Sequence, residues 1–253
     1  MSSVLNTENS WQTHSRQPSV DATTAYRMAI SQLLYRAATL PSEYFLLDSG
    51  LVQTWDKADP VHPYKCLPSH KDYLRFVARW LDSGRKRAFP KSRDMIITLT
   101  VCCWLLKDLL FRDGSQIICL SDQQKKAEHN LGRMLFAYES MPPLVKRMIP
   151  IKVAKGVSGD PRIINVLERG PLWPGGPSFK GTVAEAIAQG EQQIEEYHPS
   201  HLFWDQIETT PKPKQTYDAI MPVVKENVNF IIVGRCSPGF WSNLVHDKLD
   251  KAA

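Results

Sequence analysis

Three short apolar runs along the chain predict strands whose two faces are both buried. They are residues 116–120 (Gln-Ile-Ile-Cys-Leu), 201–204 (His-Leu-Phe-Trp) and 229–233 (Asn-Phe-Ile-Ile-Val). Nearly continuous apolar runs of this length are typical of parallel strands that helices cover on both sides. A further strand is predicted at residues 162–167, inside a Pro- and Gly-rich stretch that spans residues 141–181.

Between these runs, apolar residues recur with helical spacing. The pattern predicts a helix from about Thr24 that Pro41 ends, and a second over residues 72–83 that Gly84 ends. Residues 98–112 are too hydrophobic for a surface helix, so we expect them to pack on a sheet. Four more helices are predicted at residues 121–140, with Ser121 as the cap, and at 182–197, 216–220 and 241–249. Strands that alternate with helices predict an α/β fold with a mostly parallel sheet flanked by helices.

Composition and charge narrow the class of protein. At 43% hydrophobic residues the chain can bury a core, so residues 25–253 are predicted to fold behind a polar, flexible leader at residues 1–24. A net charge of +5 permits a nucleic-acid partner without requiring one. The longest apolar run, residues 95–106, is shorter than the roughly 20 residues that cross a bilayer, so no membrane partner is expected. The N-terminus lacks the apolar core of a signal peptide, so secretion is not expected.

The cysteines indicate a reducing compartment. Their number, five, is odd, and no CxxC pair occurs. Cys102, Cys103 and Cys119 lie in apolar runs, which is typical of buried free thiols. The chain is therefore predicted to be cytosolic, without a disulfide framework or a zinc site.

Polar residues that follow strands are the candidates for chemistry, because ligands of open α/β sheets lie beyond the carboxyl ends of the strands. The first segment is Pro90-Lys91-Ser92-Arg93 with Thr98, between a short strand and a helix. A phosphate loop needs cations for the phosphates and a hydroxyl for Mg²⁺, which Lys91, Arg93 and Thr98 or Ser92 supply. The glycines of the common phosphate-loop motif are absent, so a basic loop that caps a buried helix is the alternative.

The second segment is Asp205-Gln206, at the end of the strand over residues 201–204. A strand that delivers an Asp to its tip is how many NTPases hold the Mg²⁺ shell. Gln206 cannot accept a proton as a carboxylate does. Glu208 is a possible substitute, although strand alternation would direct its side chain differently. An exposed acidic strand end is the alternative.

The third segment is Gly234-Arg235-Cys-Ser237, where the strand over residues 229–233 ends. Arg235 or Ser237 could sense a terminal phosphate, and an ordinary strand-to-helix turn is the alternative.

A stretch of four basic residues could contact DNA phosphates, although such runs are usually only solvated: Lys146, Arg147, Lys152 and Lys155.

Taken together, the segments resemble a known family. From residue 41 onward the chain resembles the ATPase domain of the large terminase subunits of tailed phages, the motors that pump DNA into procapsids. The family often has a divergent phosphate loop of the form P-K-S-R-x-x-x-x-[ST], which residues 90–98 match. Further likeness lies in Asp48-Ser-Gly-Leu-Val52, Tyr73-Leu74-Arg75, Tyr197-His-Pro-Ser200 before Leu202-Phe-Trp-Asp205, and Pro238-Gly239-Phe-Trp241.

The resemblance implies an ASCE-class P-loop NTPase fold that binds ATP and Mg²⁺. Lys91, Ser92 and Arg93 would hold the phosphates. Thr98 and Asp205 would bind Mg²⁺, and Gln206 would occupy the water-positioning site. Ser237 would couple nucleotide state to movement, and Arg235 or the turn at residues 85–87 would be an arginine offered to a neighbouring subunit. The implied partners are double-stranded DNA, a portal protein, a small terminase subunit and other copies in a ring, in the host cytoplasm.

Two departures from the family pattern keep a second reading open. Residues 94–97 contain no glycine, and Gln206 replaces the family's catalytic Glu. The nuclease domain of full-length relatives is not expected in this chain, so no nuclease activity is expected. The alternatives are a module that binds nucleotide or DNA without hydrolysis, one half of a split terminase, or a basic α/β protein with a fortuitous likeness.

Overall fold

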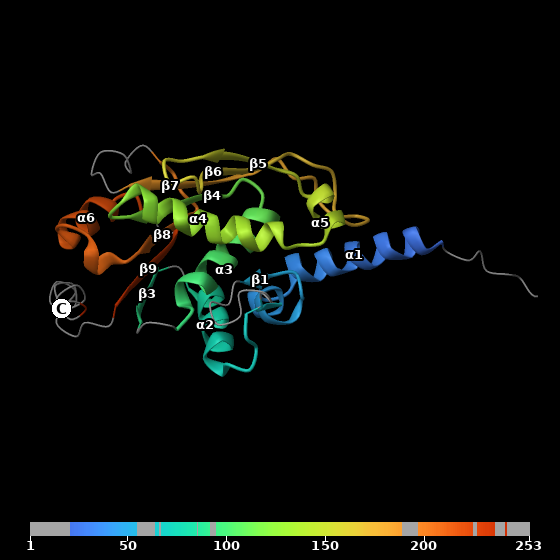
Figure 1. Ribbon diagram of the computed structural model, residues 1–253, viewed down its shortest axis with the longest axis horizontal. Coiled ribbons are helices and arrows are strands. Elements are labelled where there is room, and N and C mark those ends of the chain that lie inside the picture. Colours follow the sequence, from blue (N-terminus) through green and yellow to red (C-terminus); the bar gives the residue numbers. More distant parts are fainter. Residues whose placement is uncertain are drawn as a thin grey trace, which may run out of the picture.

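The computed structural model describes residues 21–54, 64–65, 67–84, 86–91, 95–188, 197–224, 227–235 and 241. Its centre is a seven-stranded sheet with the strand order β3-β9-β8-β4-β7-β6-β5 (Figure 1). The strands from β3 to β7 pair in parallel, whereas β6 and β5 extend the sheet in antiparallel pairs. Their bounds are β3 Lys86–Lys91, β4 Gln116–Ser121, β5 Ile151–Lys155, β6 Pro161–Val166, β7 Thr182–Ala188, β8 His201–Asp205 and β9 Asn229–Arg235.

Helices lie on both faces of this sheet. Their bounds are α1 Ala22–Thr39, α2 Asp72–Ser83, α3 Ile97–Phe111, α4 Gln124–Glu139, α5 Pro143–Met148 and α6 Pro213–Ile220. A π-helical turn follows α1 at Tyr44–Asp48, a 3-10 turn follows β8 at Ile207–Thr209, and a two-stranded sheet pairs β1, Gln53–Thr54, with β2, Tyr64–Lys65. The helices predicted from Thr24 and at residues 72–83, 98–112 and 216–220 are confirmed.

The core explains why the central strands are apolar along their whole length. Successive side chains of a strand point to opposite faces, and both faces of this sheet are covered. Phe203 and Ile231 pack in the larger core with residues of α3 and α4. Trp204 and Ile232 pack in a second core with Ile220 of α6. The predicted α/β fold with a mostly parallel sheet between helices is confirmed.

The helix predicted at residues 182–197 is wrong where the structure describes it, because Thr182–Ala188 forms β7. Ala and Glu favour a helix in isolation. Here the segment pairs with β4 on one side and β6 on the other. Pairing along both edges and the burial of Ala184 and Ala186 under α4 override the local preference.

The segment after β4 also differs from the prediction. Ser121 does not cap α4: it is the last residue of β4, and Gln123 occupies the N-cap position. In the Pro- and Gly-rich stretch, α5 and the strand β5 were not predicted. β5 is an edge strand with only Ile151 partly buried, so it lacks the apolar alternation that identifies a strand in sequence.

Several predictions fall outside the described residues, among them residues 1–20 of the leader and residues 242–249 of the last helix. The helix α1 extends away from the sheet, and its first turns are exposed (Figure 1). Cys102, Cys103 and Cys119 are buried and form no disulfide among the described residues, as predicted. Among the described residues, no helix is long and apolar enough to cross a membrane.

Candidate nucleotide site

The candidate residues lie at the carboxyl ends of three neighbouring parallel strands. β9 lies between β3 and β8. Lys91, the last residue of β3, is level with Arg235 of β9, and Asp205, the last residue of β8, is level with Val233. The sheet therefore brings the first, second and third predicted segments to one edge.

Lys91, Thr98 and Asp205 form one cluster. The Lys91 ammonium donates a hydrogen bond to Thr98 Oγ1. The Thr98 hydroxyl, 107 positions before Asp205 in sequence, donates to Asp205 Oδ1 over 3.0 Å. Lys91 Nζ lies 3.9 Å from the same carboxylate oxygen. An ammonium, a hydroxyl and a carboxylate thus meet at the carboxyl ends of β3 and β8.

The Asp205 carboxyl is only 3% exposed, and its pKa is raised. Burial is the largest cause, because a low dielectric disfavours the charged form. The charges of Lys91 and Arg133, the Thr98 hydroxyl and the Asn130 amide act in the opposite direction. A divalent cation close to such a buried carboxyl would stabilise its ionised form.

The loop that replaces the glycine-rich motif ends in a strained residue. Ile96 has φ 57° and ψ 7°, a left-handed conformation that β-branched residues rarely adopt. The Ile96 carbonyl accepts hydrogen bonds from the amide and the hydroxyl of Thr100, and the Tyr73 hydroxyl donates to the Met95 carbonyl. These contacts therefore hold Ile96 in a conformation that glycine would adopt without strain. Ser92 and Arg93 lie outside the described residues.

The chain leaves β8 in an unexpected direction. Gln206 is also left-handed, with φ 58° and ψ 47°, so strand alternation ends at Asp205. Glu208, in the following 3-10 turn, folds over the tip of β9, where its Oε1 lies 3.6 Å from Arg235 Nε. Its Oε2 is buried and has no hydrogen-bond partner among the described residues. A Cβ on Gly234 would come within 2.8 Å of that oxygen, so only glycine leaves room for the carboxylate.

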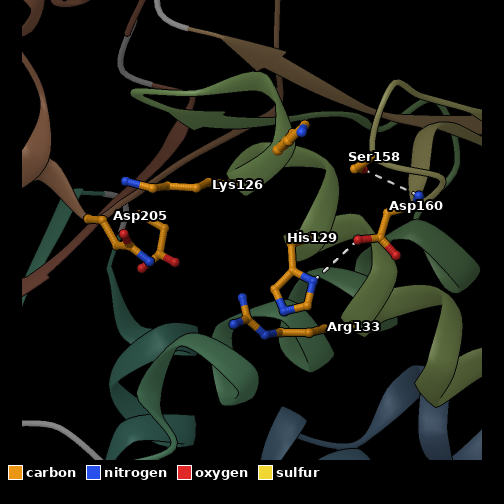
Figure 2. Close-up of a pocket in the computed structure, with 8 residues that line it drawn as sticks. Lys126, His129, Arg133, Ser158, Asp160 and Asp205 are labelled. Carbon is orange, nitrogen blue, oxygen red and sulfur yellow. Dashed lines mark hydrogen bonds and ion pairs between the residues drawn. The ribbon is translucent and has the colours of Figure 1, made fainter.

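Helix α4 contributes residues that the sequence analysis missed. The Arg133 guanidinium donates a hydrogen bond to the Asn130 side-chain oxygen and interacts with Cys102 of α3. Asn130 is 1% exposed, although it belongs to the apolar stripe that Ala127, Leu131 and Met134 define. A polar residue within the buried stripe of a helix was the signal that could have found it. Figure 2 shows Arg133 extending from α4 on the side where Asp205 lies.

Other predicted residues do not join this cluster. Lys146 and Arg147 lie on α5, and Lys152 and Lys155 lie on β5, at the edge of the sheet opposite to β3. Arg87 is buried, and its Nε donates to the Trp80 carbonyl, so it is not available to a neighbouring subunit. Ser237 lies outside the described residues.

The described sheet is mostly parallel and carries helices on both faces, and a lysine, a hydroxyl and an aspartate meet at its strand tips. Among solved structures, the HK97 bacteriophage large terminase is similar to this chain with a TM-score of 0.54 and 14% identity, over 87% of this chain and 42% of that one. The fold is therefore that of phage large terminase ATPase domains, as the sequence resemblance implied. The chain spans less than half the length of the HK97 protein.

Two other solved structures are more distantly similar. The large terminase ATPase domain of a Thermus phage has a TM-score of 0.48 and 16% identity, over 64% of this chain and 62% of that one. The large terminase of a thermophilic bacteriophage, in complex with ADP, has a TM-score of 0.47 and 10% identity, over 72% and 42%. No family model matches the sequence, and no curated protein is significantly similar to it.

Proposed function

We propose that this chain is the ATP-binding motor domain of a phage large terminase, coupling ATP hydrolysis to the packaging of double-stranded DNA into a procapsid. The observation that carries the proposal is the cluster of Lys91, Thr98 and Asp205 at the tips of parallel strands. The fold shared with the HK97 large terminase supports it. Portal protein, small terminase subunit, a ring of copies and the host cytoplasm belong to the same proposal.

The residues present fit ATP with Mg²⁺. Proteins usually bind Mg²⁺ through one or two carboxylates together with phosphates of the substrate. The Asp205 carboxylate and the Thr98 hydroxyl are oxygen ligands of this kind. Within the described part of the chain, no group of three or more His, Cys, Asp or Glu could hold a metal alone, so the ion would enter with the nucleotide. When bound, Mg²⁺ neutralises charge that develops on the phosphates.

The phosphates would be held by Lys91, with Ser92 and Arg93 beside it. The Lys91 side chain is partly exposed, and its ammonium is engaged only by Thr98 and by the more distant Asp205 among the described residues. A phosphate oxygen is a stronger partner for an ammonium than a neutral hydroxyl. The lysine is therefore placed to exchange Thr98 for the nucleotide.

Activation of the attacking water needs a carboxylate, which Gln206 lacks. The position of Glu208 supports it as the proton acceptor. Its carboxylate lies over β9, the strand between those that end in Lys91 and Asp205, and Oε2 has no hydrogen-bond partner in the described structure. Gln206 would orient the water. Arg235, which faces Glu208, and Ser237 beyond it would couple the nucleotide state to movement.

A module that binds nucleotide without hydrolysis is the second candidate. Gln206 in place of an acid favours it, as does the strained Ile96 in the loop. Turnover of Mg²⁺-ATP, measured with and without double-stranded DNA, separates the two. DNA-stimulated turnover identifies the motor, whereas ATP binding without turnover identifies the second candidate.

Lys91→Ala tests the nucleotide site itself. We expect the variant to bind ATP at least about tenfold more weakly, because one charge-assisted hydrogen bond contributes roughly 1.5–3 kcal/mol. Calorimetric titration with ATP and Mg²⁺ measures this affinity. The control is Lys180→Ala, which removes an exposed lysine outside the cluster. Equal ATP affinity for Lys91→Ala and the unmodified chain would refute the assignment.

A further inference from the structure

A pocket of about 290 Å³ lies beside Asp205, between α4, the turn that joins β5 to β6, and the tip of β8 (Figure 2). Lys125, Lys126 and Arg133 line it from α4, and Asp205 and Gln206 line it from β8. The pocket therefore shares a wall with the cluster of Lys91, Thr98 and Asp205 without being part of the phosphate loop.

Some of the positively charged side chains that line the pocket are not paired with a carboxylate and can therefore interact with a ligand. Lys126 is paired with Asp122 at 2.8 Å, and His129 with Asp160 at 3.3 Å. Among the described residues, neither Lys125 nor Arg133 forms an ion pair with a carboxylate. Asp205 partly offsets the charge of Arg133, since that charge lowers the pKa of the Asp205 carboxyl. The lining nevertheless holds three cationic side chains, Lys125, Lys126 and Arg133, against two carboxyl groups, Asp160 and Asp205, which favours an anion.

Asn130 holds Arg133 in place at the wall of this pocket. Asn130 is 1% exposed and does not line the pocket itself. Its side-chain oxygen accepts a hydrogen bond from the Arg133 guanidinium, and its amide acts on Asp205 and lowers the pKa of that carboxyl. The guanidinium is therefore fixed beside Asp205, where an anion in the pocket would meet it.

The walls of the pocket limit what fits. Its volume of about 290 Å³ lies just below the roughly 300–1,000 Å³ of small-molecule sites, which suits a ligand of the size of phosphate. The turn on the far side is held in place, because the buried Glu128 carboxylate of α4 accepts hydrogen bonds from the amides of Val157 and Ser158 and from the Ser158 hydroxyl. These hydrogen bonds therefore fix the position of one wall of the pocket.

We propose that this pocket is a binding site for inorganic phosphate, which it receives past Asp205 after hydrolysis and holds before release. The inference rests on the proposed ATPase function. Arg133 and Lys125, which line the pocket, supply the positive charge that holds the phosphate. A phosphate of the DNA backbone has the same chemistry, so the experiment has to distinguish the two sources.

The test is a calorimetric titration of the full chain with inorganic phosphate, with ADP and Mg²⁺ present at saturation. We expect phosphate to bind together with ADP. Arg133→Ala should weaken phosphate binding about tenfold, since it removes a charge-assisted hydrogen bond. Lys125→Ala, a change at an exposed position, should weaken it several-fold. Arg147→Ala is the control and should leave it unchanged.

The titrations have outcomes that would contradict phosphate binding in this pocket. Phosphate affinity that is equal in Lys125→Ala, Arg133→Ala and the unmodified chain would overturn it, as would phosphate that binds only in competition with ADP. Displacement of bound phosphate by a double-stranded oligonucleotide would assign the pocket to DNA instead. A separate ADP titration tests the proposed function, which would be refuted if the unmodified chain did not bind ADP. In that case, phosphate binding that depends on Arg133 would still identify the pocket as a phosphate site.

Discussion

At the scale of single residues, the chemistry is concentrated where the backbone is strained. Ile96 and Gln206 both adopt left-handed conformations, one before α3 and the other after β8. Such conformations cost of order 1–3 kcal/mol each and persist only where the surroundings enforce them. The two residues flank Thr98 and Asp205, so the strain lies on both sides of the cluster that we assign to the nucleotide.

The left-handed turn at Gln206 leads to a prediction about Glu208. Because the turn places the Glu208 carboxylate over β9, we expect Glu208→Gln to lower the ATP turnover rate by about 10²–10⁴-fold, the range of general base catalysis. ATP affinity should stay the same. Steady-state turnover together with ATP titration measures both quantities, and Glu139→Gln, an exposed acid on α4, is the control.

Gln206→Glu provides the complementary result. If Glu208 is the proton acceptor, a second carboxylate at position 206 should change turnover by less than about tenfold, because the required base is already present. A much larger gain in turnover for Gln206→Glu, with no loss in Glu208→Gln, would show that the site lacks its base and would favour the non-hydrolysing module.

At the scale of elements, the β5–β6 hairpin depends on one contact with α4. The buried Glu128 carboxylate accepts hydrogen bonds from the hairpin turn, and it lies directly against Gly156. The same hairpin turn supplies Ser158 and Asp160 to the pocket beside Asp205. The stability of this turn and the shape of the pocket are therefore linked.

Gly156→Ala should disrupt that contact. The added Cβ would lie 2.1 Å from Glu128 Oε1, so the carboxylate has to move and give up its hydrogen bonds. We expect the free energy of unfolding to fall by roughly 1–3 kcal/mol, as in other overpacked sites. Gly170→Ala is a matched control, because its Cβ would meet no atom within 4 Å. Denaturant unfolding measures both variants, and equal losses would contradict this account of the turn.

At the scale of the whole molecule, the two edges of the sheet differ in chemistry. The β3 edge carries the candidate nucleotide site, and the β5 edge carries exposed basic residues, with Lys146 and Arg147 of α5 near it in sequence. Edge strands with exposed lysines resist pairing with other chains, which is one reason for such residues. The proposed motor function suggests a second role for these basic residues, as a surface that binds the DNA backbone.

Replacing the basic residues with alanine tests whether they bind DNA. With Lys146, Arg147, Lys152 and Lys155 changed to Ala, we expect weaker DNA binding and a salt dependence of log K that is shallower by about 0.9 for each DNA phosphate that the variant no longer neutralises. ATP affinity should not change. Binding to a double-stranded oligonucleotide at several salt concentrations measures the slope. The control changes four exposed basic residues elsewhere to Ala, namely Arg27, Arg36, Lys180 and Lys212; an identical slope in both variants would contradict the proposal.

Much of the fold was readable from the sequence. The central strands are apolar on both faces, and α2 and α3 have clear apolar patterns and ends, so local composition was enough to place them. Lys91, Thr98 and Asp205 were also found in this way, because each follows or precedes such an element and the carboxyl ends of parallel strands meet at one edge. These features depend on residues that are close together in the chain.

Other features of the fold and of the candidate site depend on contacts between distant segments, which sequence patterns do not reveal. β7 is a strand through its pairing with β4 and β6, although its residues favour a helix. Glu208 reaches β9 because Gln206 turns the chain, and Gly234 leaves it room. Asn130 and Arg133 become neighbours of Asp205 because α4 packs over the sheet. Local sequence patterns were therefore sufficient for the central strands, for helices such as α2 and α3 and for the polar residues at their ends, whereas β7 and the side chains that meet around Asp205 depend on long-range packing.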